Sequence, residues 1–143
     1  MTEPVGSPMP GSESQPIKVL VIDDHVIVRA GLRMLIDNHD GMIVVGEAGN
    51  RVDALDAAAR EQPDIILLDL DIGGESGLDF LRELITTAPG ARILVLTGVR
   101  DPEAHRRAVH LGAMGLVLKD KAAEVLIKAI EKVHAGEVWL DRS

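Results

Sequence analysis

The sequence predicts an α/β fold in which a five-stranded parallel sheet is covered by helices on both faces. Four short, uninterrupted apolar runs rich in branched residues indicate strands that are buried on both faces. Segments with helical spacing separate these runs, so that strand and helix alternate five times. That order is typical of right-handed crossovers between parallel strands. Aromatic residues make up only 1% of the chain, so we expect an aliphatic core.

The strands are indicated by continuous apolar stretches rather than by alternation. The runs that predict central strands are Val19–Ile22, Ile65–Leu68, Ile93–Leu96 and Leu116–Leu118. A weaker run at Met42–Val45 fits a strand at the edge of the sheet.

Between the strands, apolar residues recur three or four positions apart and thus share one helical face. The predicted faces are Val28, Leu32 and Leu35; Leu55, Ala58 and Ala59; Leu78, Leu81 and Ile85; Ala104, Ala108 and Leu111; and Leu126, Ile130 and Val133. Pro102 suits the first turn of the fourth helix, where its missing N–H is no loss.

Composition limits the class of protein and of partner. Residues 1–16 are rich in Pro, Gly, Ser and Glu, which predicts a disordered N-terminal tail. The formal net charge is −8, which disfavours direct binding of nucleic acid or anionic lipid. No apolar run approaches the roughly 18 residues of a membrane span, so we expect a cytoplasmic protein without membrane contact.

Complementary polar residues follow the predicted central strands. Asp23 and Asp24 follow the first run, Asp69 the third strand, Thr97 the fourth and Lys119 the fifth. In an open α/β sheet, ligands bind at the carboxyl ends of the strands beside the point where the strand order reverses. With strand order 2-1-3-4-5, that crevice lies between the strands that end at Asp23 and Asp69.

These residue types suit phosphoryl transfer. Crowded carboxylates recruit a cation, and Mg²⁺ prefers oxygen ligands such as Asp23 or Asp24, Asp69 and a backbone carbonyl. Asp69 is then the nucleophile that forms an aspartyl-phosphate, while Lys119 and Thr97 hold phosphoryl oxygens. Singly, each residue is a common strand-end residue, and Asp24 alone also fits a helix N-cap.

In this order and spacing, the five residues resemble the response regulator receiver family of two-component signalling, over about residues 17–134. The resemblance implies a flavodoxin-like (CheY-like) fold and a phosphoryl group received from a sensor histidine kinase. It implies self-catalysed transfer and slow autodephosphorylation rather than enzyme turnover. The implied roles are phosphoacceptor for Asp69, switch hydroxyl for Thr97, phosphate-binding lysine for Lys119, and Mg²⁺ ligands for Asp23, Asp24, Asp69 and the backbone carbonyl of Asp71.

A finer resemblance is to the NarL/FixJ-type subfamily. It lies in Asp23-Asp24-His25, Arg29–Leu32, Gly112–Gly115 and the ending His134–Trp139. It implies transcription regulation, a homodimer on phosphorylation, and DNA contact only through a C-terminal helix-turn-helix absent from this chain. Residues 17–135 are then the receiver domain, and residues 136–143 begin a linker toward that effector.

The sequence departs from the family pattern near the acceptor. Ile72 and Gly73 replace the usual Met-Pro, which predicts a more mobile loop. Leu116 replaces the aromatic switch residue, so no ring is available to rotate. Gly98 replaces the usual Ala and opens the site, and Asp71 adds a carboxylate that either repels anionic donors or faces water.

Two other functions remain open on the sequence. Asp69-Leu70-Asp71 partly resembles the motif of haloacid-dehalogenase-type phosphatases, which also use an Asp nucleophile and Mg²⁺. The changed loop and the missing aromatic also fit a phosphorylation-independent dimerisation module with a vestigial pocket. We expect His25 to be a solvent-exposed residue of the first helical turn rather than a modulator of the charge of the pocket.

Overall fold

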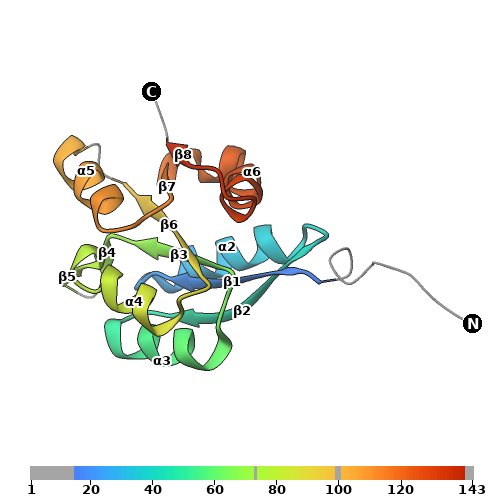
Figure 1. Cartoon of the computed structure of the whole chain (residues 1–143). Coiled ribbons are helices and arrows are strands. Elements are labelled where there is room, and N and C mark those ends of the chain that lie inside the picture. Colours follow the sequence, from blue (N-terminus) through green and yellow to red (C-terminus); the bar gives the residue numbers. More distant parts are fainter. Residues whose placement is uncertain (1–14, 73, 99–100, 141–143) are drawn as a thin grey trace, which may run out of the picture.

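The computed structural model describes residues 15–72, 74–98 and 101–140. A six-stranded parallel sheet with the order β2-β1-β3-β6-β7-β8 forms its centre (Figure 1). Its strands are β1 (Ile17–Ile22), β2 (Met42–Ala48), β3 (Ile65–Asp69), β6 (Arg92–Thr97), β7 (Gly115–Leu118) and β8 (Trp139–Leu140). The first five have the predicted order 2-1-3-4-5. The tail predicted for residues 1–16 lies almost wholly outside the described residues, as does the predicted mobile Gly73.

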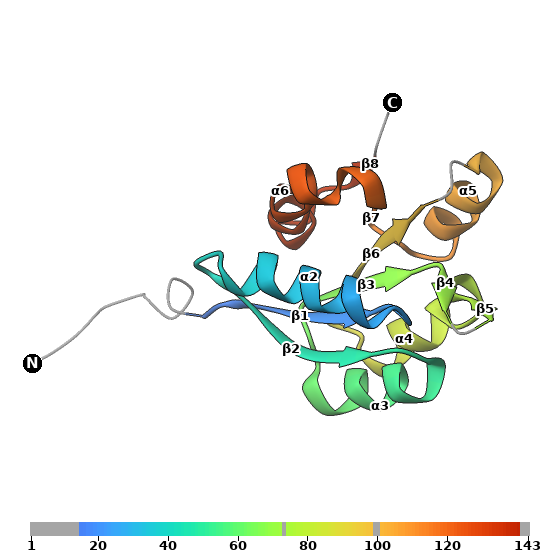
Figure 2. The ribbon, with the colours of Figure 1, turned by 180° about the vertical axis from the view of Figure 1, so that it is seen from behind.

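The helices lie in two layers, one on each face of the sheet (Figures 1 and 2). Their bounds are α2 (Val26–Asp37), α3 (Arg51–Glu61), α4 (Leu81–Thr87), α5 (Pro102–His110) and α6 (Ala122–His134). In the part of the chain that the structure describes, no helix is long and apolar enough to span a bilayer.

Each central strand supplies side chains to two separate aliphatic cores, because successive side chains point to opposite faces. Leu20 and Ile22 of β1 face α3, α4 and α5, whereas Val19 and Val21 face α2 and α6. All four side chains are buried. Burial on both faces explains why the strands appear in the sequence as continuous apolar runs.

Two helical predictions need correction. In α3, the buried residues are Ala54, Ala57 and Ala58, while Ala59 is exposed. The stretch predicted as one helix from Leu78 is divided, because a 3-10 turn, η1 (Gly77–Asp79), precedes α4. The Ser76 side chain accepts a hydrogen bond from the backbone N–H of Leu78 and so caps this turn.

Two small β elements were absent from the sequence-based expectation. A short antiparallel hairpin, β4 (Asp71–Ile72) with β5 (Glu75–Ser76), follows the acceptor strand. Strand β8 pairs with the edge strand β7, and the Trp139 N–H donates to the Met114 carbonyl at 3.0 Å. The sheet therefore extends past residue 135, where the sequence had placed the end of the domain.

Candidate functional site

The predicted site residues meet at the carboxyl edge of the sheet. Asp23 directly follows β1, Asp69 ends β3, and Thr97 ends β6. Lys119 begins a 3-10 turn, η2 (Lys119–Lys121), directly after β7. The Nζ atom of Lys119 lies 3.0 Å from Oδ2 of Asp69 and 3.2 Å from Oδ2 of Asp23. Three separate strands thus place one ammonium between two carboxylates.

The Asp69 carboxyl is almost completely enclosed, with a side chain that is 2% exposed. Its Oδ1 accepts a hydrogen bond of 3.3 Å from the backbone N–H of Asp71. Burial raises the pKa of the Asp69 carboxyl to about 6, and the negative charge of Asp23 adds to this. Lys119 and the Asp71 N–H lower the pKa of Asp69, but their effect is smaller than that of burial. The proton affinity of Asp69 is therefore set mainly by its lack of water.

Lys119 remains firmly protonated in this setting. Burial lowers its pKa, but the contacts with Asp69 and the charge of Asp23 outweigh that effect, so that the pKa of Lys119 lies above its ordinary value. Its side chain is 26% exposed, so the ammonium can also reach a ligand entering from the solvent side.

The two adjacent acids differ in burial. The Asp23 side chain is 1% exposed, whereas that of Asp24 is 30% exposed. Oδ1 of Asp23 accepts a hydrogen bond of 2.9 Å from the His25 backbone N–H. The imidazole Nδ1 of His25 lies 3.1 Å from Oδ1 of Asp23 and 3.0 Å from Oδ1 of Asp24. His25, not Asp24, is the N-cap of α2, and its ring is in direct contact with the acidic pair.

Arg29 fixes the backbone at the end of β1. Its Nη1 donates to the Asp23 carbonyl at 2.6 Å, and its Nε donates to Oε1 of Glu47 on β2 at 3.2 Å. Arg33 pairs with the other carboxylate oxygen of Glu47. A Cβ at Gly49 would lie 2.8 Å from Arg29 Nη1, so a side chain there would displace this guanidinium. The position of the acidic pair therefore depends on a link between α2 and β2.

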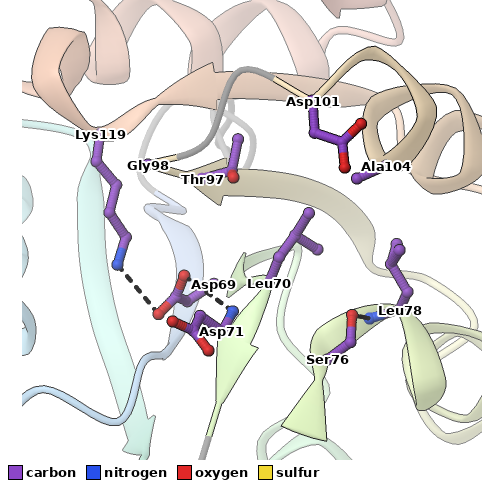
Figure 3. Close-up of a pocket in the computed structure, with 10 residues that line it drawn as sticks. All are labelled: Asp69, Leu70, Asp71, Ser76, Leu78, Thr97, Gly98, Asp101, Ala104 and Lys119. Atoms are coloured by element: carbon purple, nitrogen blue, oxygen red, sulfur yellow. Dashed lines mark hydrogen bonds and ion pairs between the residues drawn. The ribbon is translucent and has the colours of Figure 1, made fainter. Parts of the chain in front are cut away.

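A cavity of about 390 Å³ opens beside Asp69 (Figure 3). Its lining residues are Asp69, Leu70, Asp71, Ser76, Leu78, Thr97, Gly98, Asp101, Ala104 and Lys119. Thr97 is 3% exposed and lies on the wall formed by β6. The exposed Asp71 and Asp101 give the cavity a largely acidic rim. The cavity is large enough for a phosphoryl group and its hydration, with Lys119 as the cation closest to Asp69.

The donor set fits a hard divalent cation. Oδ2 of Asp23 and Oδ2 of Asp69 are buried without a hydrogen bond, although both lie within ion-pair distance of Lys119. Such oxygens are costly in a protein interior unless a cation or donor satisfies them. Asp23, Asp24, His25 and Asp69 each offer one ligand atom, and these atoms all lie within 4.8 Å of one another. Carboxylate oxygens at this spacing suit Mg²⁺.

The sequence had pointed to Asp23, Asp24, Asp69, Thr97 and Lys119, and it missed the contacts that surround them. It favoured a solvent role for His25, although adjacency to the acidic pair was a usable signal. For Asp101 no sequence signal existed, because its place on the cavity rim depends on the path of the chain after β6.

Comparisons with known proteins point to one family. The family model described as response regulator receiver domain matches residues 19–131. The nitrate/nitrite response regulator protein NarP of Escherichia coli is 43% identical over 125 residues, which cover 87% of this chain and 58% of that protein. NarL of the same organism is 37% identical over 132 residues, which cover 92% and 61% of the two chains.

Solved structures give the same result. A two-component response regulator of the LuxR family from Aurantimonas sp. SI85-9A1 has a TM-score of 0.82 and 33% identity, over 87% of this chain and 89% of that one. The present chain spans about three fifths of the length of the two curated relatives.

Proposed function

Because the chain belongs to the response regulator receiver domain family, we propose that it takes a phosphoryl group onto Asp69 from a sensor histidine kinase. The observation that carries the proposal is the position of Lys119, whose Nζ lies 3.0 Å from Asp69 Oδ2 at the edge of an acidic, cation-ready cavity. The buried carboxylate supplies the nucleophile, and the ammonium beside it supplies a positive charge that can bind the oxygens of the arriving phosphoryl group.

In the proposed reaction, an ionised oxygen of Asp69 attacks phosphorus in line with the bond to the donor nitrogen. The P–O bond forms as the P–N bond of the phosphohistidine breaks, and the electron pair leaves with the imidazole nitrogen, which takes up a proton. Lys119 then transfers its contact from the carboxylate to a phosphoryl oxygen. The Thr97 hydroxyl, on the cavity wall, donates to another phosphoryl oxygen.

Asp23, Asp24, Asp69 and the backbone carbonyl of Asp71 are the proposed holders of Mg²⁺. The ion, when bound, offsets negative charge and so lets a carboxylate approach a phosphoryl group. Arg29 and the His25 backbone N–H orient Asp23 for this task. The same residues support a slow return of the phosphoryl group to water, rather than turnover of a substrate.

The proposed output is a change at the surface formed by α5, β7 and α6. Thr97 moves toward the phosphoryl group and draws the end of β6 with it. Leu116 is 3% exposed and already packed in the core, so the response runs through β6 and α5 without rotation of a ring. We infer that this surface pairs with a second copy of the chain on phosphorylation.

The wider role follows from the relatives. NarP and NarL are named nitrate/nitrite response regulator proteins, and this chain matches about three fifths of the length of each. We propose that it regulates transcription in the cytoplasm through a C-terminal DNA-binding domain, reached by a linker that follows β8. The net charge of −8 is consistent with DNA contact through a separate module.

Intact-mass measurement after incubation with a small phosphodonor and Mg²⁺ tests the acceptor. We expect one added phosphoryl group that hydroxylamine removes, and none in Asp69→Asn. An adduct that persists in the variant would overturn the assignment. Continuous release of phosphate from a monoester would favour the phosphatase alternative. A dimer population that is the same with and without phosphorylation would favour the phosphorylation-independent dimerisation module.

A further inference from the structure

The imidazole of His25 adds a nitrogen donor to the oxygen cluster of the site. Its Nδ1 lies 3.1 Å from Oδ1 of Asp23 and 3.0 Å from Oδ1 of Asp24. The ligand atoms of these three residues and of Asp69 all lie within 4.8 Å of one another. The site therefore offers more than the carboxylates that Mg²⁺ requires.

Helix capping does not account for this orientation of the ring. His25 is the N-cap of α2, yet its side chain makes no capping hydrogen bond. Its side chain is also 58% exposed, so packing does not force Nδ1 against the two acids. The contact with the two carboxylates is therefore what holds the ring in place.

The spacing of the donors matches the coordination shell of a metal ion. Two ligands at right angles on bonds of about 2.1 Å are about 3.0 Å apart. Both distances from His25 Nδ1 to the acid oxygens have this length. These donors can therefore bind a metal ion without large movement of the ring.

Ligand chemistry then decides which cation gains from His25. Mg²⁺ takes oxygen ligands and keeps its waters, so an imidazole adds little to its binding. Cobalt, nickel and zinc dications bind imidazole well and exceed Mn²⁺ in affinity for mixed nitrogen and oxygen sites. A ring nitrogen at this position therefore raises affinity for these ions selectively.

We propose that the site also binds a late first-row transition dication of the cobalt-to-zinc class, with Nδ1 of His25 as a ligand beside the carboxylates of Asp24 and Asp69. The proposal deepens the proposed function, since the same position holds Mg²⁺ in phosphoryl transfer. Occupation by such an ion ties Asp69 into a metal shell and displaces Mg²⁺.

Titration of the metal-free protein with Co²⁺, followed by visible absorption and calorimetry, tests the inference. Loss of an imidazole ligand in His25→Ala is expected to weaken Co²⁺ binding about 10-fold or more, as metal-site substitutions typically do. Binding of Mg²⁺ is expected to change by less than about 2-fold, since its ligands are oxygens. His39→Ala is the matched control, because His39 also lies beside a carboxylate, 3.4 Å from Glu131 Oε2, but away from the acidic pair.

Nitrogen NMR of the histidine rings gives a second readout. With Zn²⁺ bound, Nδ1 of His25 is expected to show a metal-bound shift and Nε2 to carry the proton. The inference is overturned if His25→Ala weakens Co²⁺ and Mg²⁺ equally, if it weakens neither, or if Nδ1 keeps its metal-free shift. Failure of the wild type to take up phosphoryl with Mg²⁺ contradicts the proposed function alone, because His25-dependent Co²⁺ binding is measured without any phosphodonor.

Discussion

Lys119 Nζ lies 3.0 Å from Oδ2 of Asp69, a carboxylate whose side chain is 2% exposed. The same ammonium is 3.2 Å from Asp23, so it is the positive charge that allows two buried acids to stand side by side. When a phosphoryl group arrives, this charge is already in place. The contact of Lys119 with the two acids thus contributes both to the stability of the metal-free protein and to the binding of a phosphoryl group.

Lys119→Met is therefore expected to destabilise the metal-free protein. Breaking a partly buried ion pair leaves an uncompensated carboxylate. We expect the free energy of unfolding to fall by about 2–3 kcal/mol at neutral pH, a range that already allows for the partial exposure of the lysine. Urea unfolding measures this loss. Lys128→Met, on the exposed side of α6, is the control and is expected to be nearly neutral. Equal stability of the two variants would show that Lys119 does not offset the charge of the acids.

The raised pKa of Asp69 predicts a specific dependence of stability on pH. The folded carboxyl has a pKa of about 6, above its unfolded value, so the folded state binds more protons between about pH 4 and 6. The free energy of unfolding contributed by this group falls as pH rises through that window. Above it, the ionised carboxylate costs about 3 kcal/mol.

Asp69→Asn removes this cost. Without metal, the variant is expected to be more stable than the wild type at neutral pH and to show a flatter pH profile between about pH 4 and 6. Thermal unfolding at several pH values gives both quantities. Asp40→Asn, at an exposed turn residue, is the control and should keep the wild-type slope. A wild-type profile that rises with pH in this window would contradict the direction of the shift.

Much of this site could be predicted because its residues directly follow apolar strands. Asp23, Asp69 and Thr97 end continuous runs of branched residues, and the rule that parallel strands share one carboxyl edge brings them together. The contacts of Arg29 could not be predicted, and for His25 the sequence offered only its adjacency to the acidic pair, not the direction of its ring. They depend on side-chain direction at the start of α2 and on the register of β2, neither of which a single sequence fixes.

Divalent cation is expected to stabilise the folded state. Mg²⁺ at about 100 times its dissociation constant adds about 2.7 kcal/mol to the free energy of unfolding, because only the folded chain assembles the ligands. The rise in Tm with Mg²⁺ measures this gain. Asp24→Asn should lose most of the rise and Asp40→Asn should keep it. An undiminished rise in Asp24→Asn would remove Asp24 from the ligand set.

Gly77 is expected to be intolerant of a side chain. A Cβ at this position would lie 2.6 Å from the Asp69 carbonyl oxygen, and the Gly77 N–H donates to the Leu70 carbonyl at 2.7 Å. Gly77→Ala must therefore shift the backbone of the acceptor strand, with an expected loss of about 1–3 kcal/mol. Gly31→Ala, on α2 with nothing within 4 Å, is the control, and is expected to stabilise the helix by up to about 1 kcal/mol.

The phosphoryl uptake of the two glycine variants separates position from stability. Gly77→Ala is expected to be slower than the wild type even under conditions where it is fully folded, since the acceptor carboxylate moves with its backbone. Gly31→Ala should react at the wild-type rate. Wild-type uptake by a folded Gly77→Ala protein would mean that this close approach has no part in placing Asp69.

The switch position is expected to accept the aromatic side chain that the family usually carries. Leu116 lines a cavity of about 310 Å³ together with His105, Arg106, Val109 and Leu140. A ring at this position can extend into the cavity, so Leu116→Phe is expected to cost less than about 1.5 kcal/mol. Leu94, by contrast, is completely buried in the core between the sheet and α6.

Leu94→Phe is therefore the matched comparison, with an expected cost of about 1–3 kcal/mol or more from overpacking. Urea unfolding of both variants measures the difference. If Leu116→Phe is as destabilising as Leu94→Phe, the cavity beside Leu116 does not admit a ring. If Leu116→Phe is tolerated, the absence of the aromatic reflects the way this chain signals rather than a lack of room. The dimer population of Leu116→Phe with and without phosphorylation then measures the effect of the ring on dimerisation.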